Sequence, residues 1–406
     1  MRIIFLSGLY PPYTKGGAEI STHYIARGLV ELGHNVTVIA EGIQRQEGHY
    51  DGVQVIRIPF PFTKKVLFEK KQSKFLAECL KKEIGDPSLY DVIHAQDFRM
   101  AMALSETGWS NIAVTARDYA QISGCTNDML AGGGITPGCS DGVHLLSCHR
   151  VAEVHGVKKI GRAVAYKINH EYRRSAFENF SLHVFISHAQ KKRILATRSL
   201  VEPFMPVIYN SLPPEYLSAN IRVGHGSSFL YVGTTEEYKG VGVLLKAWET
   251  IAKEDENAHL TIVGNGADRP RYEEQLARLG LQYRVTFEGK VEYDRLEDIY
   301  DESDAVIAPH LWVEPFGRTV AEGMSRGKVV ITSNCGGPTE LVGANERGLL
   351  VERNSVPSLI DGMRAFLGMS QYDRRALGEN AQRWVRENLS MEIIARQYEK
   401  AYTDWL

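Results

Sequence analysis

The sequence predicts an α/β protein with two Rossmann-like domains, each built on a doubly wound parallel sheet. Short apolar, β-branched runs alternate with longer amphipathic stretches through both halves of the chain. That alternation is typical of parallel sheets that carry helices on both faces. The chain has 406 residues, more than one ordinary hydrophobic core accommodates. We therefore expect two cores and two sheets.

The candidate strands are continuous apolar runs, as expected for strands buried on both faces. In the first half they lie at 2–7, 35–40, 53–58, 91–95, 111–115, 183–187 and 206–210. In the second half they lie at 229–233, 259–264, 284–289, 304–308, 328–333 and 348–351. Helical patterns separate most of them, for example at 18–32 and 242–253, and the last helices span about 371–406.

The domain boundary is predicted within 210–228, where prolines, glycines and serines cluster and the periodicity fails. We expect an N-terminal domain over 1–215 and a C-terminal domain over 225–385. The segment at about 120–180 breaks the alternation and is interpreted as an insertion in the first domain. The final stretch, 386–406, is predicted to be a helix that packs back on the N-terminal domain.

Composition and charge exclude several classes of protein. The formal net charge is -2, which disfavours a surface built for nucleic acid. No apolar run approaches the roughly 18 residues of a membrane helix, and the N-terminus resembles a buried strand rather than a signal peptide. Five cysteines indicate a reducing, cytoplasmic location. Basic stretches such as 62–75 and 158–167 predict either peripheral contact with the inner face of a membrane or ordinary solvated helix faces.

Two strand-to-helix turns carry the first candidate ligand contacts, because ligands of open α/β sheets bind beyond the carboxyl ends of the strands. In "YPPYTKGGAE" (10–19), Gly16 and Gly17 let the backbone approach a ligand at a helix N-terminus; the alternative is an ordinary loop. In "VGTTEEYKG" (232–240), Lys239 could place a positive charge over a phosphate; the alternative is a solvated lysine. "VGNGAD" (263–268) lacks the third glycine of a dinucleotide fingerprint.

A third turn, "EPFGRTVAEG" (314–323), holds two glutamates with seven residues between them. Thr319 lies in the first turn of the predicted helix, where its hydroxyl and backbone N–H suit an anion. Glu322 could accept two ribose hydroxyls, and Glu314 could face the polyol end of the same ligand. One loop would then hold a nucleotide sugar at both ends. The alternative is a pair of exposed acids at the edge of a helix.

The string 309–342, "PHLWVEPFGRTVAEGMSRGKVVITSNCGGPTELV", resembles the donor-site signature of retaining glycosyltransferases of the GT-B fold, glycosyltransferase family four. The stretches 10–38 and 185–212 resemble further parts of the same family. The resemblance implies two Rossmann-like domains that face each other across a cleft, with the acceptor bound by the first and the donor by the second. It also implies transfer of a sugar from a nucleotide donor to an acceptor hydroxyl with retention of the anomeric configuration.

The resemblance assigns roles to individual residues. Lys239 would neutralise the departing diphosphate, and Glu314 would hold the donor sugar. Glu322 would hold the ribose. The remaining donor contacts would come from backbone groups near the phosphates, the sugar and the base, namely Gly16, Gly17, Phe316, Gly317, Thr319, Val320, Gly264, Gly266, Lys290 and Val291.

The sequence departs from the family pattern in two places. Thr234 follows Gly233 where family members usually have an arginine, so we expect Arg318 or another cation to take its place, or the diphosphate to be held less strongly. Arg117 stands where many relatives have a histidine. An arginine cannot act as a general base, but it could carry charge to the donor or bind an acidic acceptor. Its alternative role is a structural ion pair with Asp118.

The predicted chemistry needs no cofactor beyond a UDP- or GDP-sugar. No Asp-x-Asp triplet occurs in the sequence, which favours a metal-independent enzyme, and no carboxylate stands out as a covalent nucleophile. We expect the departing phosphate oxygen to act as base for an acceptor that attacks from the same face. The acceptor would be a glycan, a lipid-linked molecule or a small molecule, and no nucleic acid is expected.

Two other readings of the whole chain stay open. The chain could be a nucleotide-sugar epimerase of the same fold, or a non-catalytic nucleotide-sugar-binding partner subunit. A separate feature is a loose cluster of potential metal ligands, which predicts either a zinc site or unconnected thiols. Its members are Cys125, Cys139, Cys148 and His149.

Overall fold

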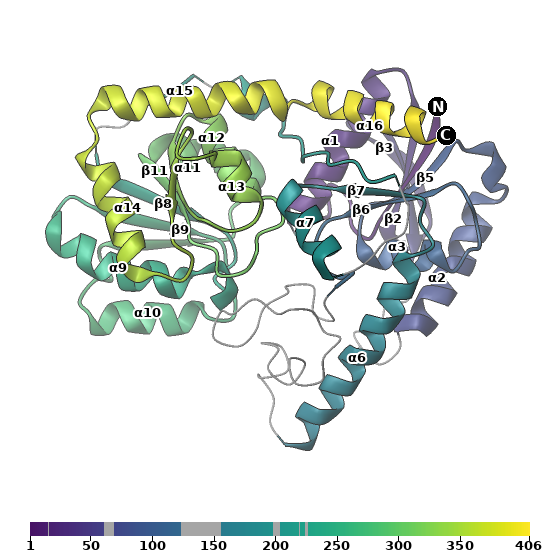
Figure 1. The fold of residues 1–406 in the computed structure, drawn as a ribbon, viewed down its shortest axis with the longest axis horizontal. Coiled ribbons are helices and arrows are strands. Elements are labelled where there is room, and N and C mark those ends of the chain that lie inside the picture. Colours follow the sequence, from purple (N-terminus) through teal and green to yellow (C-terminus); the bar gives the residue numbers. More distant parts are fainter. Residues whose placement is uncertain (15, 61–68, 123–155, 198–203, 219, 224–225) are drawn as a thin grey trace. The chain divides into compact units, whose positions relative to one another are not determined.

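The computed structural model describes residues 1–14, 16–60, 69–122, 156–197, 204–218, 220–223 and 226–406 (Figure 1). The chain divides into two compact units. The N-terminal domain comprises Met1–Ser211 together with Met391–Leu406, and the C-terminal domain comprises Leu212–Ser390. The expected fold class is confirmed, since each domain contains one sheet of largely parallel strands flanked by helices.

The N-terminal domain has a seven-stranded sheet in the order β3-β4-β2-β1-β5-β6-β7. Neighbouring strands are parallel except for β3 and β4, which pair antiparallel. In the register at the centre, Ile4 of β1 lies opposite Thr37 of β2 and Ile93 of β5. The strands are β1 (Arg2–Ser7), β2 (Asn35–Gly42), β3 (Gln46–Tyr50), β4 (Val53–Pro59), β5 (Val92–Ala95), β6 (Ile112–Ala116) and β7 (Leu182–Phe185).

Helices cover both faces of this sheet. Successive residues of a strand point to opposite faces, so Ile3 and Phe5 of β1 pack in one core and Ile4 and Leu6 in another. The first core is closed by α1 and α16, and the second by α2 and α3. The helices are α1 (Gly17–Glu31), α2 (Glu69–Ile84), α3 (Phe98–Ser105), α6 (Val157–Phe177), α7 (His188–Thr197) and α16 (Met391–Trp405).

Helix α16 is bound closely to α1, although nearly the whole chain separates them. A Cβ atom on Gly28 of α1 would lie 2.8 Å from the Cβ of Ala395, so only a glycine permits this approach. The same side of α16 reaches the sheet through Tyr402, whose hydroxyl lies 2.7 Å from Nδ1 of the buried His94. The last helix of the chain is therefore part of the N-terminal core.

The C-terminal domain has a six-stranded parallel sheet in the order β10-β9-β8-β11-β12-β13. The strands are β8 (Ser228–Val232), β9 (His259–Val263), β10 (Val285–Gly289), β11 (Ala305–Ala308), β12 (Val329–Ser333) and β13 (Leu349–Val351). The helical elements are α8 (Pro214–Leu217), η3 (Glu237–Lys239), α9 (Val241–Glu254), α10 (Arg269–Arg278), α11 (Tyr293–Glu302), α12 (Arg318–Ser325), α13 (Gly337–Val342), α14 (Val356–Gly368) and α15 (Gln371–Asn388).

Two helix–sheet contacts define the layers of this domain. On one face, α9 and α14 bury Trp248 and Phe366 against Phe229 of β8. On the other face, α12 lies directly on β11 and β12. The approach is so close that a Cβ atom on Gly323 would come within 3.0 Å of Val306 and 3.1 Å of Val330. The glycine after Glu322 thus brings α12 close to the sheet.

The structure corrects one predicted strand and adds another. Residues 206–210 form no strand; Val207 makes only an isolated bridge to Phe185. Pro206 lacks an N–H group, so it can accept but not donate a ladder hydrogen bond. The added strand is β3, all of whose residues are exposed, and such a strand gives no hydrophobic pattern to detect.

Two predictions concern segments that are described only in part. Most of the predicted insertion, 123–155, lies outside the described residues, as do the four candidate zinc ligands. The basic helix expected around 150–178 is present as α6 (Val157–Phe177). In the described part of the chain, no helix combines the length and apolarity that a membrane-spanning segment requires.

Candidate active site

The carboxyl edge of the C-terminal sheet gathers most of the residues predicted to bind a donor. Gly233 and Thr234 follow β8, Gly264–Gly266 follow β9, and Lys290–Val291 follow β10. The loop 309–317 follows β11 and leads into α12. Since the strands are parallel, these loops share one edge, which is where open α/β sheets bind ligands.

Glycines bring the loops at this edge into backbone contact. The backbone N–H of Gly264 donates to the carbonyl of Gly289 at 2.7 Å, and that of Gly233 donates to Val263 at 2.9 Å. Gly264 has φ +122, and a Cβ atom there would lie 1.9 Å from the carbonyl oxygen of Gly233. No other residue type fits this position without displacing the neighbouring loop.

The loop that carries Glu314 is held from behind by a pair of glycines. The N–H of Gly337 donates to the carbonyl of Glu314 at 2.8 Å. Gly336 has φ +71, and a Cβ atom there would lie 2.1 Å from the same carbonyl oxygen. A Cβ atom on Gly337 would lie 2.6 Å from the Cα of Phe316. The Gly-Gly step therefore fixes the backbone of the Glu-Pro-Phe-Gly turn.

The Glu314 carboxylate is the centre of a charged cluster. Its Oε2 accepts hydrogen bonds from Nζ of Lys239 at 2.8 Å and from Nε1 of Trp312 at 2.9 Å. Burial would raise the pKa of Glu314, but the Lys239 ammonium and the hydrogen bonds from Lys239 and Trp312 hold it below its ordinary value. The carboxylate is thus kept ionised, and the contacts described for it all fall on Oε2.

Aromatic rings enclose the ammonium of Lys239. Nζ lies 4.8 Å from the ring centre of Trp312 and 5.7 Å from that of Tyr238. These are cation–π distances, and the side chain is only 20% exposed. The sequence predicts that Lys239 and Glu314 lie at the same edge of the C-terminal sheet, and in the structure the two side chains are in direct contact.

His310 lies on the buried side of the same cluster. Its Nε2 is 3.7 Å from Oε2 of Glu314, and the side chain is nearly inaccessible to solvent. Burial lowers the pKa of His310 to about 4, with Glu314 opposing that shift and Lys239 adding to it. The imidazole is therefore neutral at physiological pH and adds no charge to the site.

Glu322 lies in a second, separate cluster, in which it is 2% exposed. Its Oε1 accepts from Nε of Arg318 at 2.9 Å and from the hydroxyl of Tyr293 at 3.0 Å. Its Oε2 accepts from the hydroxyl of Tyr300 at 2.9 Å. Arg318 also donates to the Tyr293 hydroxyl at 2.8 Å. Both charges of this pair are therefore satisfied within the protein.

Helix α12 presents its N-terminus between the two glutamates. Gly317 is its N-cap with φ +93, and a Cβ atom there would lie 2.8 Å from Cγ of Pro338. The amides of Arg318, Thr319 and Val320 belong to the first turn, which has no intrahelical acceptors. Thr319 is half-buried and Val320 is buried. The turn offers partial positive charge at the edge where the ligand loops meet.

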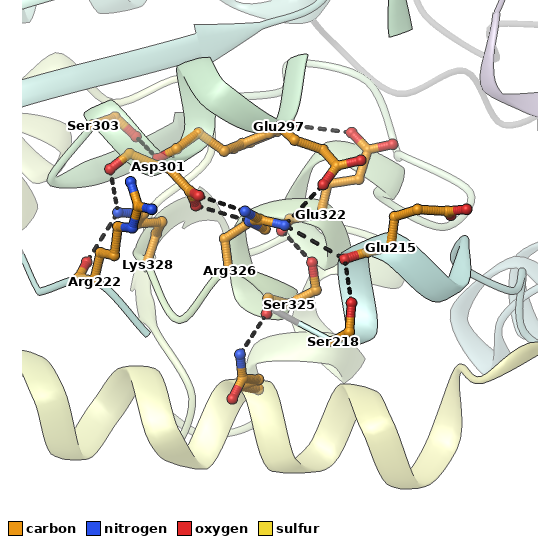
Figure 2. Close-up of polar contacts among 12 residues, drawn as sticks. Glu215, Ser218, Arg222, Glu297, Asp301, Ser303, Glu322, Ser325, Arg326 and Lys328 are labelled. Atoms are coloured by element: carbon orange, nitrogen blue, oxygen red, sulfur yellow. Dashed lines mark hydrogen bonds and ion pairs between the residues drawn. The ribbon is translucent and has the colours of Figure 1, made fainter. Parts of the chain in front are cut away.

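Figure 2 shows the polar contacts that fix the other end of α12. Arg326, just past the helix, pairs with Glu297 at 3.0 Å and forms a two-nitrogen contact with the Asp301 carboxylate. Nζ of the buried Lys328 donates to the carbonyls of Arg222 at 3.0 Å and Asp301 at 2.9 Å. Two of these partners, Glu297 and Asp301, belong to α11. Helix α12 is therefore anchored at its C-terminal end, while its N-terminus faces the carboxyl edge of the sheet.

Three other predicted residues lie at the C-terminal edge and form no described ion pair. The Thr234 hydroxyl lies 3.3 Å from a carboxylate oxygen of Glu236, so it supplies no positive charge in place of the missing arginine. Lys290 is exposed and Val291 is half-buried. Arg318 is paired with Glu322 rather than lying beside Lys239, so the structure does not place it in the role of a second phosphate-loop cation.

The remaining predicted residues lie in the N-terminal domain. Gly16 is the N-cap of α1, where its N–H donates to Oε2 of Glu19 at 3.0 Å, and Gly17 is the first residue of the helix. Arg117 follows β6, and its guanidinium donates to Oε1 of Gln96 at 2.7 Å and to the side chain of Asn210. The side-chain oxygens of Gln96 and Asn210 therefore help to hold Arg117 at the carboxyl edge of this sheet.

Sequence reasoning missed the aromatic part of the site. Trp312 bonds the Glu314 carboxylate, and Tyr293 and Tyr300 bond Glu322. Trp312 lies two residues before Glu314, so the i, i+2 spacing of an indole donor was a usable signal. The tyrosines lie on α11 or at its start, about twenty to thirty residues away in sequence, and only the fold brings them to Glu322.

Both domains match known protein families. Residues 221–384 match the family described as Glycosyl transferases group 1, and residues 15–115 match the family described as Glycosyltransferase Family 4. One match therefore lies in the C-terminal domain and includes both glutamates. The other lies in the N-terminal domain and includes the Gly16–Gly17 turn.

Similar proteins cover nearly the whole chain. An uncharacterized glycosyltransferase of Methanocaldococcus jannaschii is 27% identical over 420 residues, which cover 99% of this chain and 98% of that protein. Sucrose-phosphate synthase from Thermosynechococcus elongatus has a TM-score of 0.76 at 20% identity, over 99% and 98% of the two chains. The Anabaena protein HepE, in complex with UDP and glucose, has a TM-score of 0.66 at 19% identity over 99% of each chain. The chain is a glycosyltransferase of the GT-B fold, of the kind grouped in glycosyltransferase family four.

Proposed function

We propose that this glycosyltransferase moves a sugar from a nucleoside diphosphate sugar to an acceptor hydroxyl, with retention of configuration and without a metal ion. The observation that carries the proposal is the Lys239–Glu314 pair at the ligand edge of the C-terminal sheet. A cation there suits a departing diphosphate, and a carboxylate beside it suits sugar hydroxyls. HepE, which has the same fold, was solved with UDP and glucose, and this supports a nucleotide-sugar donor.

The donor sugar and diphosphate would bind around Glu314 and the start of α12. Oε1 of Glu314 has no described protein donor and would accept sugar hydroxyls, while Oε2 stays bonded to Lys239 and Trp312. The amides of Thr319 and Val320 would donate hydrogen bonds to phosphate oxygens, as anions are commonly bound at helix N-termini. The backbone of Phe316 and Gly317 would line the sugar.

The ribose and base would bind on either side of the phosphates. Oε2 of Glu322 accepts one described hydrogen bond, from Tyr300. A carboxylate oxygen has two lone pairs, so a ribose hydroxyl has a site there without displacing the tyrosine. The base would lie against the backbone at Gly264–Gly266 and Lys290–Val291, and Gly16 and Gly17 would add contacts to the donor phosphates.

In the proposed reaction, the bond between the anomeric carbon and the diphosphate oxygen breaks, and the electron pair leaves with the diphosphate. The acceptor oxygen bonds to the same face of the anomeric carbon, and its proton passes to the departing phosphate oxygen. Negative charge grows on the diphosphate in the transition state, where Lys239 and the α12 amides stabilise it. No protein carboxylate needs to form a covalent intermediate.

Metal independence rests on the same positive groups. A lysine ammonium and a helix N-terminus can stabilise a leaving diphosphate without a divalent cation, and the sequence has no Asp-x-Asp triplet to hold one.

Arg117 is proposed to contribute positive charge toward the donor or an acidic acceptor. The acceptor would be a glycan, a lipid-linked molecule or a small molecule, and a lipid-linked one would place the protein peripherally at a membrane.

The test is turnover of candidate donors by the purified protein in the presence of EDTA. UDP-, GDP- and ADP-sugars are incubated with and without a mixture of saccharide acceptors, and NMR follows the nucleoside diphosphate, the free sugar and the anomeric configuration of any product. We expect one donor to be hydrolysed or transferred with retention, and we expect the Glu314→Ala variant to lose that activity. Inversion, a requirement for metal, or epimerised donor without acceptor would each contradict the corresponding part of the proposal.

A further inference from the structure

His310 is a buried histidine whose ring makes no hydrogen bond in the described part of the chain. It follows β11 at the carboxyl edge of the C-terminal sheet and is 3% exposed. Among the described residues, neither Nδ1 nor Nε2 of the ring has a hydrogen-bond partner. A polar group that is buried without a partner costs folding free energy. Such a group at the edge where the ligand loops meet therefore needs a reason for its position.

The ring of His310 faces the Glu314 carboxylate from just beyond hydrogen-bonding distance. Nε2 lies 3.7 Å from Oε2 of Glu314, whereas an N–H···O bond is about 2.7–3.2 Å long. That oxygen already accepts from Nζ of Lys239 at 2.8 Å and from Nε1 of Trp312 at 2.9 Å. A carboxylate oxygen has two lone pairs, so Lys239 and Trp312 leave no acceptor site on Oε2 for His310.

The imidazole has the chemistry of a donor to this carboxylate. Because burial lowers the pKa of His310 to about 4, the ring is neutral at physiological pH and carries one N–H group. The negative charge of Glu314 favours the tautomer with that proton on Nε2, since the other tautomer would turn a lone pair toward the carboxylate. A movement of less than about 1 Å would then bring Nε2 within bonding distance of Oε2.

We propose that His310 replaces Lys239 as a hydrogen-bond donor to Glu314 when the diphosphate of the nucleotide sugar takes up the Lys239 ammonium. This inference rests on the proposed function, which brings a diphosphate to Lys239. In the ligand-free protein Lys239 occupies the lone pair, and His310 stays unbonded. In the donor complex the ammonium moves to the phosphates, and the Nε2–H group of His310 closes on the vacated lone pair.

The exchange would keep Glu314 in place while its ion pair opens. A carboxylate that is largely buried and loses its cation is destabilised unless another donor takes over. His310 supplies that donor without adding charge, so Glu314 stays directed toward the sugar hydroxyls and Lys239 is free to stabilise the leaving group. His310 is thus a positioning residue, which acts through Glu314 and does not need to touch the donor.

The test is a double-mutant cycle between His310 and Lys239, measured by calorimetric binding of the nucleoside diphosphate that the turnover screen selects. In the otherwise wild-type protein, His310→Leu should weaken binding about 10- to 100-fold, as expected for a lost hydrogen bond to a charged group. In the Lys239→Ala background, the same substitution should change the affinity by less than about twofold. There His310 already bonds Glu314 before the ligand arrives, so binding gains no new bond.

Two further variants separate positioning of Glu314 from a general packing role. His310→Gln keeps an N–H donor near the place of Nε2 and should recover most of the affinity that His310→Leu loses. His259→Leu is a matched control, because it removes an imidazole of the same domain that lies 2.8 Å from the Thr286 hydroxyl at the opposite edge of the sheet. It should leave nucleotide binding unchanged in both backgrounds.

Urea unfolding without ligand gives a second measurement of the same exchange. His310→Leu should destabilise the Lys239→Ala protein more than it destabilises the wild type, because only the former has the bond between His310 and Glu314 in its ligand-free state. A purely packing role of the ring would give equal losses of stability in the two backgrounds.

The inference would be overturned by equal losses of nucleotide affinity in both backgrounds, or by a loss in His310→Gln as large as that in His310→Leu. A nucleotide-bound crystal structure in which Lys239 still bonds Glu314 and His310 stays 3.7 Å away would also overturn it. A wild-type protein that binds no nucleoside diphosphate would instead contradict the proposed function, and this inference would fall with it. The two failures are therefore distinguishable.

Discussion

The ammonium of Lys239 lies 2.8 Å from the carboxylate of Glu314, and the indole of Trp312 contacts both. The site is therefore charge-balanced before any ligand binds. A diphosphate that takes up Lys239 must compete with Glu314 for the ammonium, and a sugar hydroxyl that donates to Glu314 relieves that competition. The two ends of a nucleotide sugar would thus support each other's binding through one ion pair.

Replacement of Lys239 by alanine is expected to lower kcat more than it lowers donor affinity. Charge develops on the diphosphate mainly in the transition state, so the loss in kcat should be roughly 10²- to 10³-fold. Steady-state kinetics and calorimetric binding of the nucleoside diphosphate measure the two quantities separately. Equal losses in both would show that Lys239 binds the ground state only.

Replacement of Glu322 by alanine is expected to weaken nucleoside diphosphate binding and also to destabilise the fold. The stability loss should be about 3–5 kcal/mol, because the buried guanidinium of Arg318 would lose the carboxylate that it bonds. The double variant R318M/E322M removes both charges and should recover much of the stability in urea unfolding. Its affinity for the nucleotide should stay low; recovered affinity would contradict contact between Glu322 and the ribose.

Replacement of Gly336 by alanine is expected to abolish donor turnover by moving the Glu314 loop. The added Cβ would lie 2.1 Å from the Glu314 carbonyl oxygen, so one of the two loops must shift. Gly280→Ala is a matched control, since Gly280 has φ +68 and no atom within 4 Å of an added Cβ. Both variants carry a backbone strain of about 1–2 kcal/mol. If the Gly336 variant stays as active as the Gly280 variant, the loop does not need its observed position.

The stability of the protein is expected to fall as the pH drops below about 6.5, in part through His94. Burial, aided by Arg117, lowers the pKa of His94 from 6.5 to about 3. Between these values the unfolded chain binds a proton that the folded chain does not, so the free energy of unfolding decreases with falling pH. The share of His94 between pH 7.5 and 5 is about 2 kcal/mol.

Urea unfolding of a His94→Gln variant at these two pH values measures that share. The variant loses the contacts of His94 with Tyr402 and Thr115, so it should be less stable than the wild type at pH 7.5. Its further loss on going to pH 5 should be smaller by about 2 kcal/mol. A variant with an unchanged pH slope would show that His94 is protonated in the folded protein.

The sheets were predictable because their strands are continuous apolar runs with few competing patterns. β8, β9, β11 and β12 lie within one or two residues of their predicted limits. Strand β3 was not predictable, since it lies at the edge of its sheet and all its residues are exposed. The run 206–210 is apolar enough for a strand. However, Pro206 cannot donate a backbone hydrogen bond and Val207 makes only one isolated bridge, so no ladder of strand pairing forms.

The site was predictable as a set of loops but not as a set of contacts. The motif places Glu314 and Glu322 on either side of the start of a helix, and parallel topology brings Lys239 to the same edge. That Lys239 bonds Glu314, whereas Arg318 bonds Glu322, depends on side-chain directions that only the packed structure defines. The spacing of Arg318 and Glu322 is i, i+4 on one helix, so their ion pair had a usable signal in the sequence.

The most direct test of the donor site is a crystal structure of the protein with a nucleoside diphosphate sugar selected by the turnover screen. We predict sugar hydroxyls on Glu314, phosphate oxygens at Lys239 and at the amides of Thr319 and Val320, and a ribose hydroxyl on Glu322. A donor bound elsewhere, with the Lys239–Glu314 pair unchanged and out of contact with it, would contradict the assignment of this edge as the site of glycosyl transfer.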